Sequence, residues 1–123
     1  MTLKNNLYNI LSADPEKKSF RIKLNPDCKI YKAHFPGKPI TPGVCIIQIA
    51  SELLNELIPC NRTLSTVGNA KFLSIINPLE SEEVTFTFKK ITEEDGYLKV
   101  SATVSDKDTI FTKLSLKYQN PDK

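Results

Sequence analysis

The second half of the chain alternates hydrophobic and polar residues with a period of two. The stretches that follow this pattern are residues 64–76, 84–89, 98–104 and 113–118. Because period two sends successive side chains to opposite faces, each stretch is predicted to be a strand with one buried face. Residues 94–96 and 105–108 carry Asp, Gly and Ser, which are typical of hairpin turns. The pattern therefore predicts an antiparallel sheet.

One long helix is predicted from residue 43 to residue 58, where hydrophobic residues recur at helical spacing until Pro59 stops the pattern. Its apolar arc is wide, which suits a helix wrapped by a sheet better than one that lies on a surface. A narrow polar stripe remains along one side, made of Gln48, Glu52, Asn55 and Glu56. One helix packed against an antiparallel sheet is an α+β architecture.

The first forty residues are less regular. Leu3, Leu7, Ile10 and Leu11 recur at helical spacing, so a short amphipathic helix is predicted over residues 2–11. Alternation over residues 20–24 predicts a strand that ends in a turn at residues 25–27. A second extended piece is expected at residues 29–31.

Composition and charge narrow the class of protein. At 123 residues the chain is expected to form one domain, residues 1–123, with a core that needs no disulfide. A formal net charge of +3 is too small to indicate nucleic-acid binding, yet it is compatible with docking to an acidic protein. Three cysteines without paired spacing, and no long apolar run at the start, favour a cytoplasmic location.

The sequence gives little support for a metal site or for membrane insertion. The chain has one histidine and no C-x-x-C motif, so we expect no metal site and no cofactor. No segment approaches the roughly 20 apolar residues that span a bilayer, so we expect no membrane insertion.

The stretch from residue 34 to residue 48 concentrates the candidate chemistry. It holds the only histidine, three of the eight prolines and two of the four glycines. Prolines fix φ and stiffen the loop, Thr41 is a suitable N-cap, and Pro42 suits the first helical position. The N–H groups of Gly43 and Val44 would then lie at the positive end of the helix dipole, where they can stabilise a developing oxyanion.

His34 is the candidate proton carrier. Its imidazole can take and return a proton near neutrality without a large pKa shift, although a structural role for it stays open. Cys45 could be a nucleophile activated by the helix N-terminus, but a small buried core residue is the simpler interpretation. Four lysines form either a docking patch for an acidic carrier protein or an ordinary solvated surface: Lys29, Lys32, Lys38 and Lys71.

The run H-F-P-G-x-P-x-x-P-G-V at residues 34–44 closely resembles the motif of the 3-hydroxyacyl-(acyl carrier protein) dehydratases of fatty acid synthesis. A second segment, Lys71-Phe72 followed by Pro78, is similar to the K-F-x-x-P-V-x-P-G-D segment of that family, although Leu79 and Glu80 replace its Gly and Asp. The two segments span most of the chain in the family's order. The resemblance implies a hot-dog fold, in which an antiparallel sheet wraps around one long central helix.

The resemblance also implies where the chemistry takes place. In that family two subunits pair their sheets edge to edge, and each active site lies at the interface of the dimer, which can assemble further. Carried over, His34 would remove the α-proton of a 3-hydroxyacyl thioester on acyl carrier protein, while the Gly43 N–H binds the thioester carbonyl. Substrate contacts are expected from Phe35, Pro36, Gly37, Val44 and Phe72.

One position departs from the family. The family's helix carries a catalytic carboxylate fourteen positions after the histidine, and Gln48 stands there in this chain. An amide donates and accepts hydrogen bonds but cannot carry a proton through a reaction at neutral pH. Three hypotheses stay open. His34 acts with Gln48 only orienting the β-hydroxyl, Glu52 replaces the carboxylate from one turn further on, or a different hot-dog subunit supplies it in a heterodimer.

The function predicted from the sequence is therefore dehydration of 3-hydroxyacyl thioesters to trans-2-enoyl thioesters, in fatty acid, polyene or polyketide synthesis, with an atypical active site. Two other functions remain. One is a non-catalytic or half-site subunit of a heteromeric dehydratase, which the loss of the carboxylate favours. The other is a hot-dog thioesterase, in which polar groups such as Gln48 and Glu52 hold the attacking water.

Overall fold

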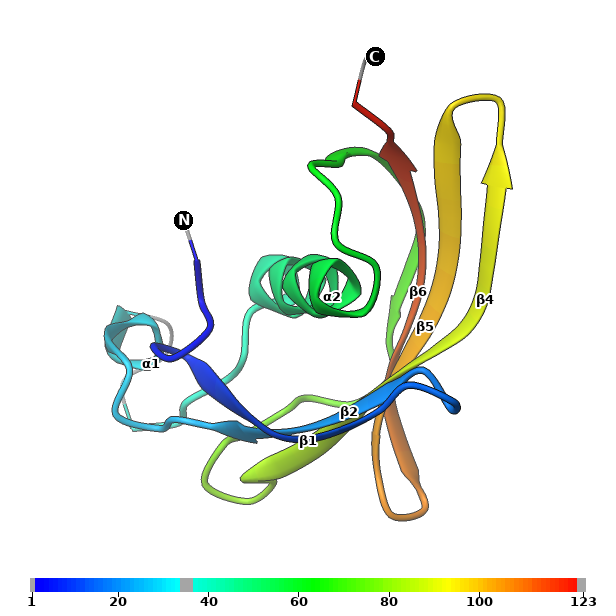
Figure 1. The fold of residues 1–123 in the computed structure, drawn as a ribbon. Helices are drawn as coiled ribbons and strands as arrows, with labels where there is room; N and C mark the ends of the chain where they lie inside the picture. The colour runs from blue at the N-terminus through cyan, green and yellow to red at the C-terminus, as the bar shows by residue number, and fades with distance from the viewer. Residues whose placement is uncertain (1, 34–36, 122–123) are drawn as a thin grey trace.

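The computed structural model describes residues 2–33 and 37–121. Its sheet has six strands in the order β1-β2-β4-β5-β6-β3, and every neighbouring pair is antiparallel. The elements are β1 (Tyr8–Asp14), β2 (Ser19–Leu24), α1 (Lys29–Ala33), α2 (Gly43–Leu57), β3 (Thr63–Phe72), β4 (Glu83–Glu94), β5 (Tyr97–Asp106) and β6 (Thr109–Gln119). Figure 1 shows the sheet curving around α2, which confirms the predicted α+β arrangement.

The core lies between α2 and the concave face of the sheet. Alternate residues of β4 and β5 face the helix and are buried: Val84, Phe86, Phe88, Leu98, Val100, Ala102 and Val104. The strand register brings these residues together across the ladder, for example Phe86 opposite Val104. Burying this apolar face, at about 25 cal/mol per Å² removed from water, is what holds the sheet around the helix.

The central helix agrees closely with the sequence prediction of residues 43–58. It runs over Gly43–Leu57, and the Ile58 N–H donates to the Leu54 oxygen at 2.8 Å before Pro59, which has no N–H to continue the pattern. Six of its hydrophobic residues are buried: Cys45, Ile46, Ile49, Ala50, Leu53 and Leu54. Over the described residues, no helix has both the length and the apolar content needed to cross a membrane.

The start of the chain corrects the prediction of a helix over residues 2–11. The Leu7 N–H does bond the Leu3 oxygen, at 2.8 Å, but only this one turn forms, and Asn5 within it has a left-handed φ of 67°. From Tyr8 onward the chain is strand β1, paired with β2. The apolar spacing was misleading because Leu3 and Leu7 are buried in a turn while the residues after them pair with a neighbouring strand.

Two further boundaries differ from the prediction. Residues 29–31, expected to be extended, lie in the short helix α1. The strand predicted over residues 64–76 ends at Phe72, because the Leu73 and Ser74 N–H groups both turn to the Phe111 oxygen, at 2.8 and 3.1 Å. The chain then leaves the sheet, and the Ile76 oxygen accepts the Thr41 N–H at 2.9 Å.

Strand β3 forms one edge of the sheet and is largely exposed. Its ladder with β6 shifts register between Leu64 and Thr66 and again between Val67 and Asn69. Leu64, Val67 and Phe72 are large hydrophobic residues with substantial exposure on this strand. Exposed apolar side chains on an open strand edge are typical of a surface that pairs with another chain.

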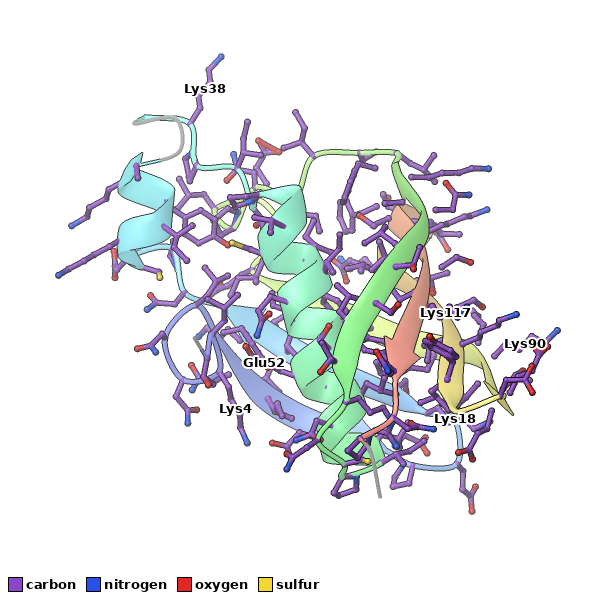
Figure 2. The ribbon with its side chains drawn as sticks, turned by 90° about the horizontal axis from the view of Figure 1, so that it is seen from above. Lys4, Lys18, Lys38, Glu52, Lys90 and Lys117 are labelled. Atoms are coloured by element: carbon purple, nitrogen blue, oxygen red, sulfur yellow. The ribbon has the colours of Figure 1, made fainter. Side chains whose placement is uncertain are left out.

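The carboxylate of Glu52 ties the beginning of the chain to α2. It accepts hydrogen bonds from the Leu3 N–H at 2.8 Å, the Lys4 N–H at 2.9 Å, the Tyr8 hydroxyl at 3.0 Å and the Gln48 amide at 2.8 Å. Figure 2 shows Glu52 on the side of α2 that faces the segment carrying Lys4. Burial, together with the neighbouring Glu52 charge, raises the pKa of Tyr8, so its hydroxyl stays a donor at neutral pH.

Replacing Glu52 should therefore destabilise the fold. We expect Glu52→Ala to lower the free energy of unfolding by about 3 kcal/mol, because buried donors would lose a charged acceptor. Glu56→Ala is the matched control. Among the described residues, Glu56 bonds only Lys4 Nζ, in a pair whose side chains are 36% and 43% exposed, and such pairs contribute at most about 1 kcal/mol. Urea unfolding measures both, and equal losses for the two variants would contradict the anchoring role of Glu52.

Candidate active site

The motif loop is closed at its base by a buried hydrogen bond. The Tyr31 hydroxyl, on α1, and the Thr41 hydroxyl, before α2, lie 2.8 Å apart, and both residues are at least 96% buried. The Thr41 N–H also bonds the Ile76 oxygen. These contacts fix both ends of the loop that carries the sequence motif.

Three of the predicted site residues, His34, Phe35 and Pro36, lie outside the residues that the structure describes. Their predicted roles stay predictions. Gly37, the next residue, is exposed and has a φ of 87°, a left-handed conformation that residues with a side chain rarely adopt.

The beginning of α2 differs from the prediction in one respect. Pro42 is the N-cap residue, with φ −63° and ψ 145°, and no side chain caps the helix. Thr41, predicted to be the N-cap, instead uses its hydroxyl to contact Tyr31. Within the described part of the chain, the first N–H at this end with an acceptor is that of Cys45, which donates to the Pro42 oxygen at 2.9 Å. Among the described residues, the preceding N–H groups of Gly43 and Val44 have no backbone acceptor, and their predicted role toward an oxyanion stays a prediction.

Gly43 and Phe72, both predicted site residues, are in direct contact. A Cβ atom placed on Gly43 would lie 2.7 Å from the tip of the Phe72 ring, closer than carbon atoms pack. Glycine therefore lets the end of β3 approach the start of α2. Phe72 is 49% exposed and Val44 is 75% exposed, so an apolar surface surrounds this helix end.

Gln48 lies one turn into α2, half-buried, with its amide nitrogen 2.8 Å from a Glu52 oxygen. Because Glu52 already accepts bonds from Leu3, Lys4 and Tyr8, its carboxylate is committed to holding the N-terminal segment. This engagement argues against the hypothesis that Glu52 takes the role of the carboxylate predicted at position 48. Sequence spacing placed Glu52 correctly beside Gln48 but gave no sign of what would bind it.

Cys45 is a core residue, as the simpler interpretation held. Its side chain is buried, and burial, with a smaller contribution from Cys28, raises the pKa of the Cys45 thiol. A thiol with a raised pKa is a poor nucleophile at neutral pH. Among the residues described, no group of three His, Cys, Asp or Glu side chains could hold a metal ion.

The four lysines considered as a docking patch are all exposed. Lys29 and Lys32 lie on α1, Lys38 extends outward from the loop before α2, and Lys71 lies on β3 (Figure 2 labels Lys38). Lys71 therefore lies on the sheet, whereas the other three lysines lie on α1 or in the loop before α2. Docking to a carrier protein stays a prediction for this surface.

Comparison with known proteins identifies the family. The model of the ApeI-like family, described as ApeI dehydratase, matches residues 11–114, and the chain belongs to this family of hot-dog dehydratases. It is 28% identical over 102 residues to the 3-hydroxyacyl-[acyl-carrier-protein] dehydratase FabZ of Lactobacillus helveticus, a match covering 77% of this chain and 69% of that protein. A match to the FabZ of Clostridium acetobutylicum has 29% identity and covers 67% of this chain and 63% of the relative.

Solved structures show the same fold. The dehydratase heterocomplex ApeI:P from Xenorhabdus doucetiae contains a chain that aligns with a TM-score of 0.69 and 18% identity, covering 90% of this chain and 96% of that one. A putative thioesterase from Silicibacter sp. TM1040 aligns with a TM-score of 0.63 and 8% identity, covering 96% and 81%. Both likenesses establish the hot-dog fold, which dehydratases and thioesterases share.

Tyr31 is a positioning residue that the sequence did not single out. The contact between Tyr31 and Thr41 depends on helix α1. Because residues 29–31 were predicted to be extended, the hydrophobic pattern of the sequence offered no reason to expect these two side chains together. Burial, partly offset by the hydrogen bond with Thr41, raises the pKa of Tyr31 to about 12.

Removing the Tyr31 hydroxyl should weaken the base of the loop and change the response to alkaline pH. We expect Tyr31→Phe to lower the free energy of unfolding by about 1 kcal/mol at neutral pH. In the parent, stability should fall as pH rises from about 10, where the unfolded chain begins to ionise, to about 12, because the folded state keeps this phenol protonated for longer. Tyr31→Phe should make that fall shallower.

The control for this pH experiment is Tyr97→Phe, which keeps the ring that Lys117 Nζ approaches at 4.2 Å. Chemical denaturation at a series of pH values gives the slopes. Identical alkaline slopes for Tyr31→Phe and Tyr97→Phe would contradict a special role for the Tyr31 phenol.

Proposed function

We propose that this chain dehydrates 3-hydroxyacyl thioesters, carried on acyl carrier protein in the cytoplasm, to trans-2-enoyl thioesters. The observation that carries the proposal is the uncapped N-terminus of α2, where Gly43 makes close contact with Phe72 directly after the family's histidine motif. Family membership supports the reaction class. The pathway is that of fatty acid, polyene or polyketide synthesis.

In the proposed reaction, the thioester carbonyl oxygen lies against the Gly43 N–H. His34 takes the α-proton, and the negative charge that develops on the carbonyl oxygen is stabilised by that N–H and by the helix dipole. The electron pair then forms the Cα–Cβ double bond as the Cβ–O bond breaks. His34 returns its proton to the leaving hydroxide, which departs as water.

Gln48 gives this site its atypical character. Its amide nitrogen donates to Glu52, and we expect a hydrogen bond between the amide and the substrate's β-hydroxyl to orient the leaving group. Gln48 can therefore orient the leaving group but cannot protonate it. Losing a general acid typically costs about 10²–10⁴ in rate, so the homodimer would be a slow dehydratase.

A second candidate is a half-site subunit of a heteromeric dehydratase. The exposed edge strand β3 and the apolar surface around Val44 and Phe72 are suited to a partner subunit. A partner with an intact carboxylate would complete the site that Gln48 leaves without an acid. The relative in the ApeI:P heterocomplex supports pairing between different hot-dog subunits.

The first test is turnover of a 3-hydroxyacyl-carrier-protein by the purified chain, followed by mass spectrometry of the acyl group. We expect slow formation of the 2-enoyl product that disappears in His34→Ala. A folded parent protein without turnover would exclude the self-sufficient enzyme and favour the half-site subunit. Release of free carrier-protein thiol without enoyl product would instead identify a thioesterase.

Restoring a carboxyl group at position 48 should accelerate the reaction in a pH-dependent way. In Gln48→Glu the new carboxyl group would lie in contact with the Glu52 carboxylate, and this like charge should raise its pKa. Its protonated form can act as the general acid. We expect faster turnover than the parent, with the advantage lost as pH rises through the raised pKa.

Gln48→Met, which removes the polar group at similar size, is the control for the position-48 experiment. It should be no faster than the parent at any pH. If Gln48→Glu and Gln48→Met had the same pH–rate profile, the proposed role of position 48 would be wrong.

A further inference from the structure

A polar pocket opens beside Gln48, away from the N-terminus of α2. It lies between the second half of α2, the segment that follows the helix, and strands β3 and β6, and has a volume of about 300 Å³. Its walls include Gln48, Ser51 and Asn55 from the helix, Arg62 from the connection to β3, and Tyr118 from β6. Along the helix axis, Gln48 and Asn55 are about 10 Å apart.

The pocket carries an uncompensated positive charge. None of the nine residues that line it is Asp or Glu, and Arg62 is its one charged member. The acidic residues of this part of α2 are used elsewhere, because Glu52 holds Leu3, Lys4 and Tyr8, and Glu56 pairs with Lys4. In the described part of the chain, Arg62 has no ion-pair partner.

Hydrogen bonding at Arg62 is also incomplete. Its Nη1 donates to the Ile58 oxygen at 2.8 Å, which holds the guanidinium in place. Its Nε is buried, and no acceptor for it exists among the described residues. A buried N–H without an acceptor costs about 1–3 kcal/mol, and a planar oxyanion is the group that a guanidinium fork matches best.

Neutral polar groups complete the lining, and the Asn55 amide is the donor among them. The Asn55 amide oxygen accepts the Cys60 N–H at 3.0 Å, which leaves the amide nitrogen as a donor. The Ser51 hydroxyl donates to the Ile47 oxygen at 3.0 Å and accepts the Tyr118 hydroxyl at 2.7 Å, so both hydroxyl hydrogens are used within the protein. Burial raises the pKa of Tyr118, so its phenol remains protonated at neutral pH. An anion would meet the Arg62 Nε–H and the Asn55 amide as donors, and no carboxylate to repel it.

We propose that this pocket binds a carboxylate at the far end of the substrate's acyl chain, with Arg62 as the specificity-determining residue. The assignment rests on the proposed function. With the reacting carbons at Gln48, a chain that follows α2 would bring a group several carbons further on to Arg62. A free carboxylate has the same chemistry, and the experiments below distinguish the two sources.

The first experiment observes Arg62 directly in the full-length protein. The sequence has two arginines, so ¹⁵N-labelled protein gives two Nε–H signals in an NMR spectrum. Arg21 is the internal control, because it already bonds Glu83, Thr85 and Asp106. Titration with hexanoate should shift the Arg62 signal in a saturable way and leave Arg21 unchanged, whereas 1-hexanol should shift neither.

Three results of this titration would overturn the proposal. The first is an Arg62 signal that does not respond to hexanoate, or responds equally to 1-hexanol. The second is an equal response to chloride, which would indicate only an adventitious anion. The third is protection of the Arg62 Nε–H that grows with protein concentration in the absence of carboxylate, which would assign the pocket to a second copy of the chain.

The second experiment compares two 3-hydroxyacyl-carrier-protein substrates of equal length, one ending in a carboxylate and one in a methyl group. In Arg62→Gln, the kcat/KM ratio of the carboxylate-ended to the methyl-ended substrate should fall by about 10- to 100-fold, as expected for loss of a charged hydrogen bond. Arg21→Gln should leave the ratio unchanged. An unchanged ratio in Arg62→Gln, despite hexanoate binding, would refute the chain-end assignment in favour of a free carboxylate.

Failure of the proposed function can be told apart from failure of the pocket assignment. If the parent turned over neither substrate, the dehydratase proposal would fail, while the NMR titration would still decide whether Arg62 binds carboxylates. Arg62→Lys keeps the charge but lacks Nε, and it tests whether misfolding explains the lower kcat/KM ratio of Arg62→Gln. It should lower the kcat/KM ratio less than Arg62→Gln does.

Discussion

Burial of α2 inside a curved sheet is the constraint on which the other features of this molecule depend. Once the apolar arc of the helix is packed against β4, β5 and β6, only one side of it can carry polar groups. Gln48 and Glu52 share that side, so the candidate reacting position and the anchor for the N-terminal segment are neighbours. The hydrogen bond from Gln48 to Glu52 therefore links the candidate site to the contacts that hold the N-terminal segment on α2.

This proximity means that the residue at position 48 affects Glu52 as well as the proposed reaction. A carboxylate there would face Glu52 at hydrogen-bond distance, and two negative charges so close would compete for one proton. An amide removes that conflict and strengthens the hold of Glu52 on the first residues of the chain. Gln48 thus makes a neutral hydrogen bond to Glu52 where a carboxylate would repel it.

The sequence predicted the parts of the fold that strong periodicity controls. Strands β4, β5 and β6 and helix α2 follow from alternation and from a long apolar arc, and Pro59 marks the helix end. The segment over residues 2–11 was mispredicted because two leucines at helical spacing support a single turn as well as a helix. Residues 29–31 lie in a helix of only five residues, too short for a periodic signal.

The site was only partly predictable for a related reason. The motif located Gly43 and Phe72, and the structure brings them into contact. The Tyr31–Thr41 bond, the four donors around Glu52 and the pocket at Arg62 join residues that are distant in sequence, and no local pattern encodes such meetings. In the sequence, nothing distinguishes Arg62 from an ordinary loop arginine. Only the residues that surround it in the structure show that it lines a pocket.

The two register shifts in β3 have a consequence for assembly. Only residues 69–72 of this strand follow β6 without interruption, and they end at the ring that touches Gly43. A bulged strand is twisted locally, so it offers a straight edge over a short length only. Any strand added along β3 would therefore find its best alignment beside the start of α2, where Phe72 meets Gly43.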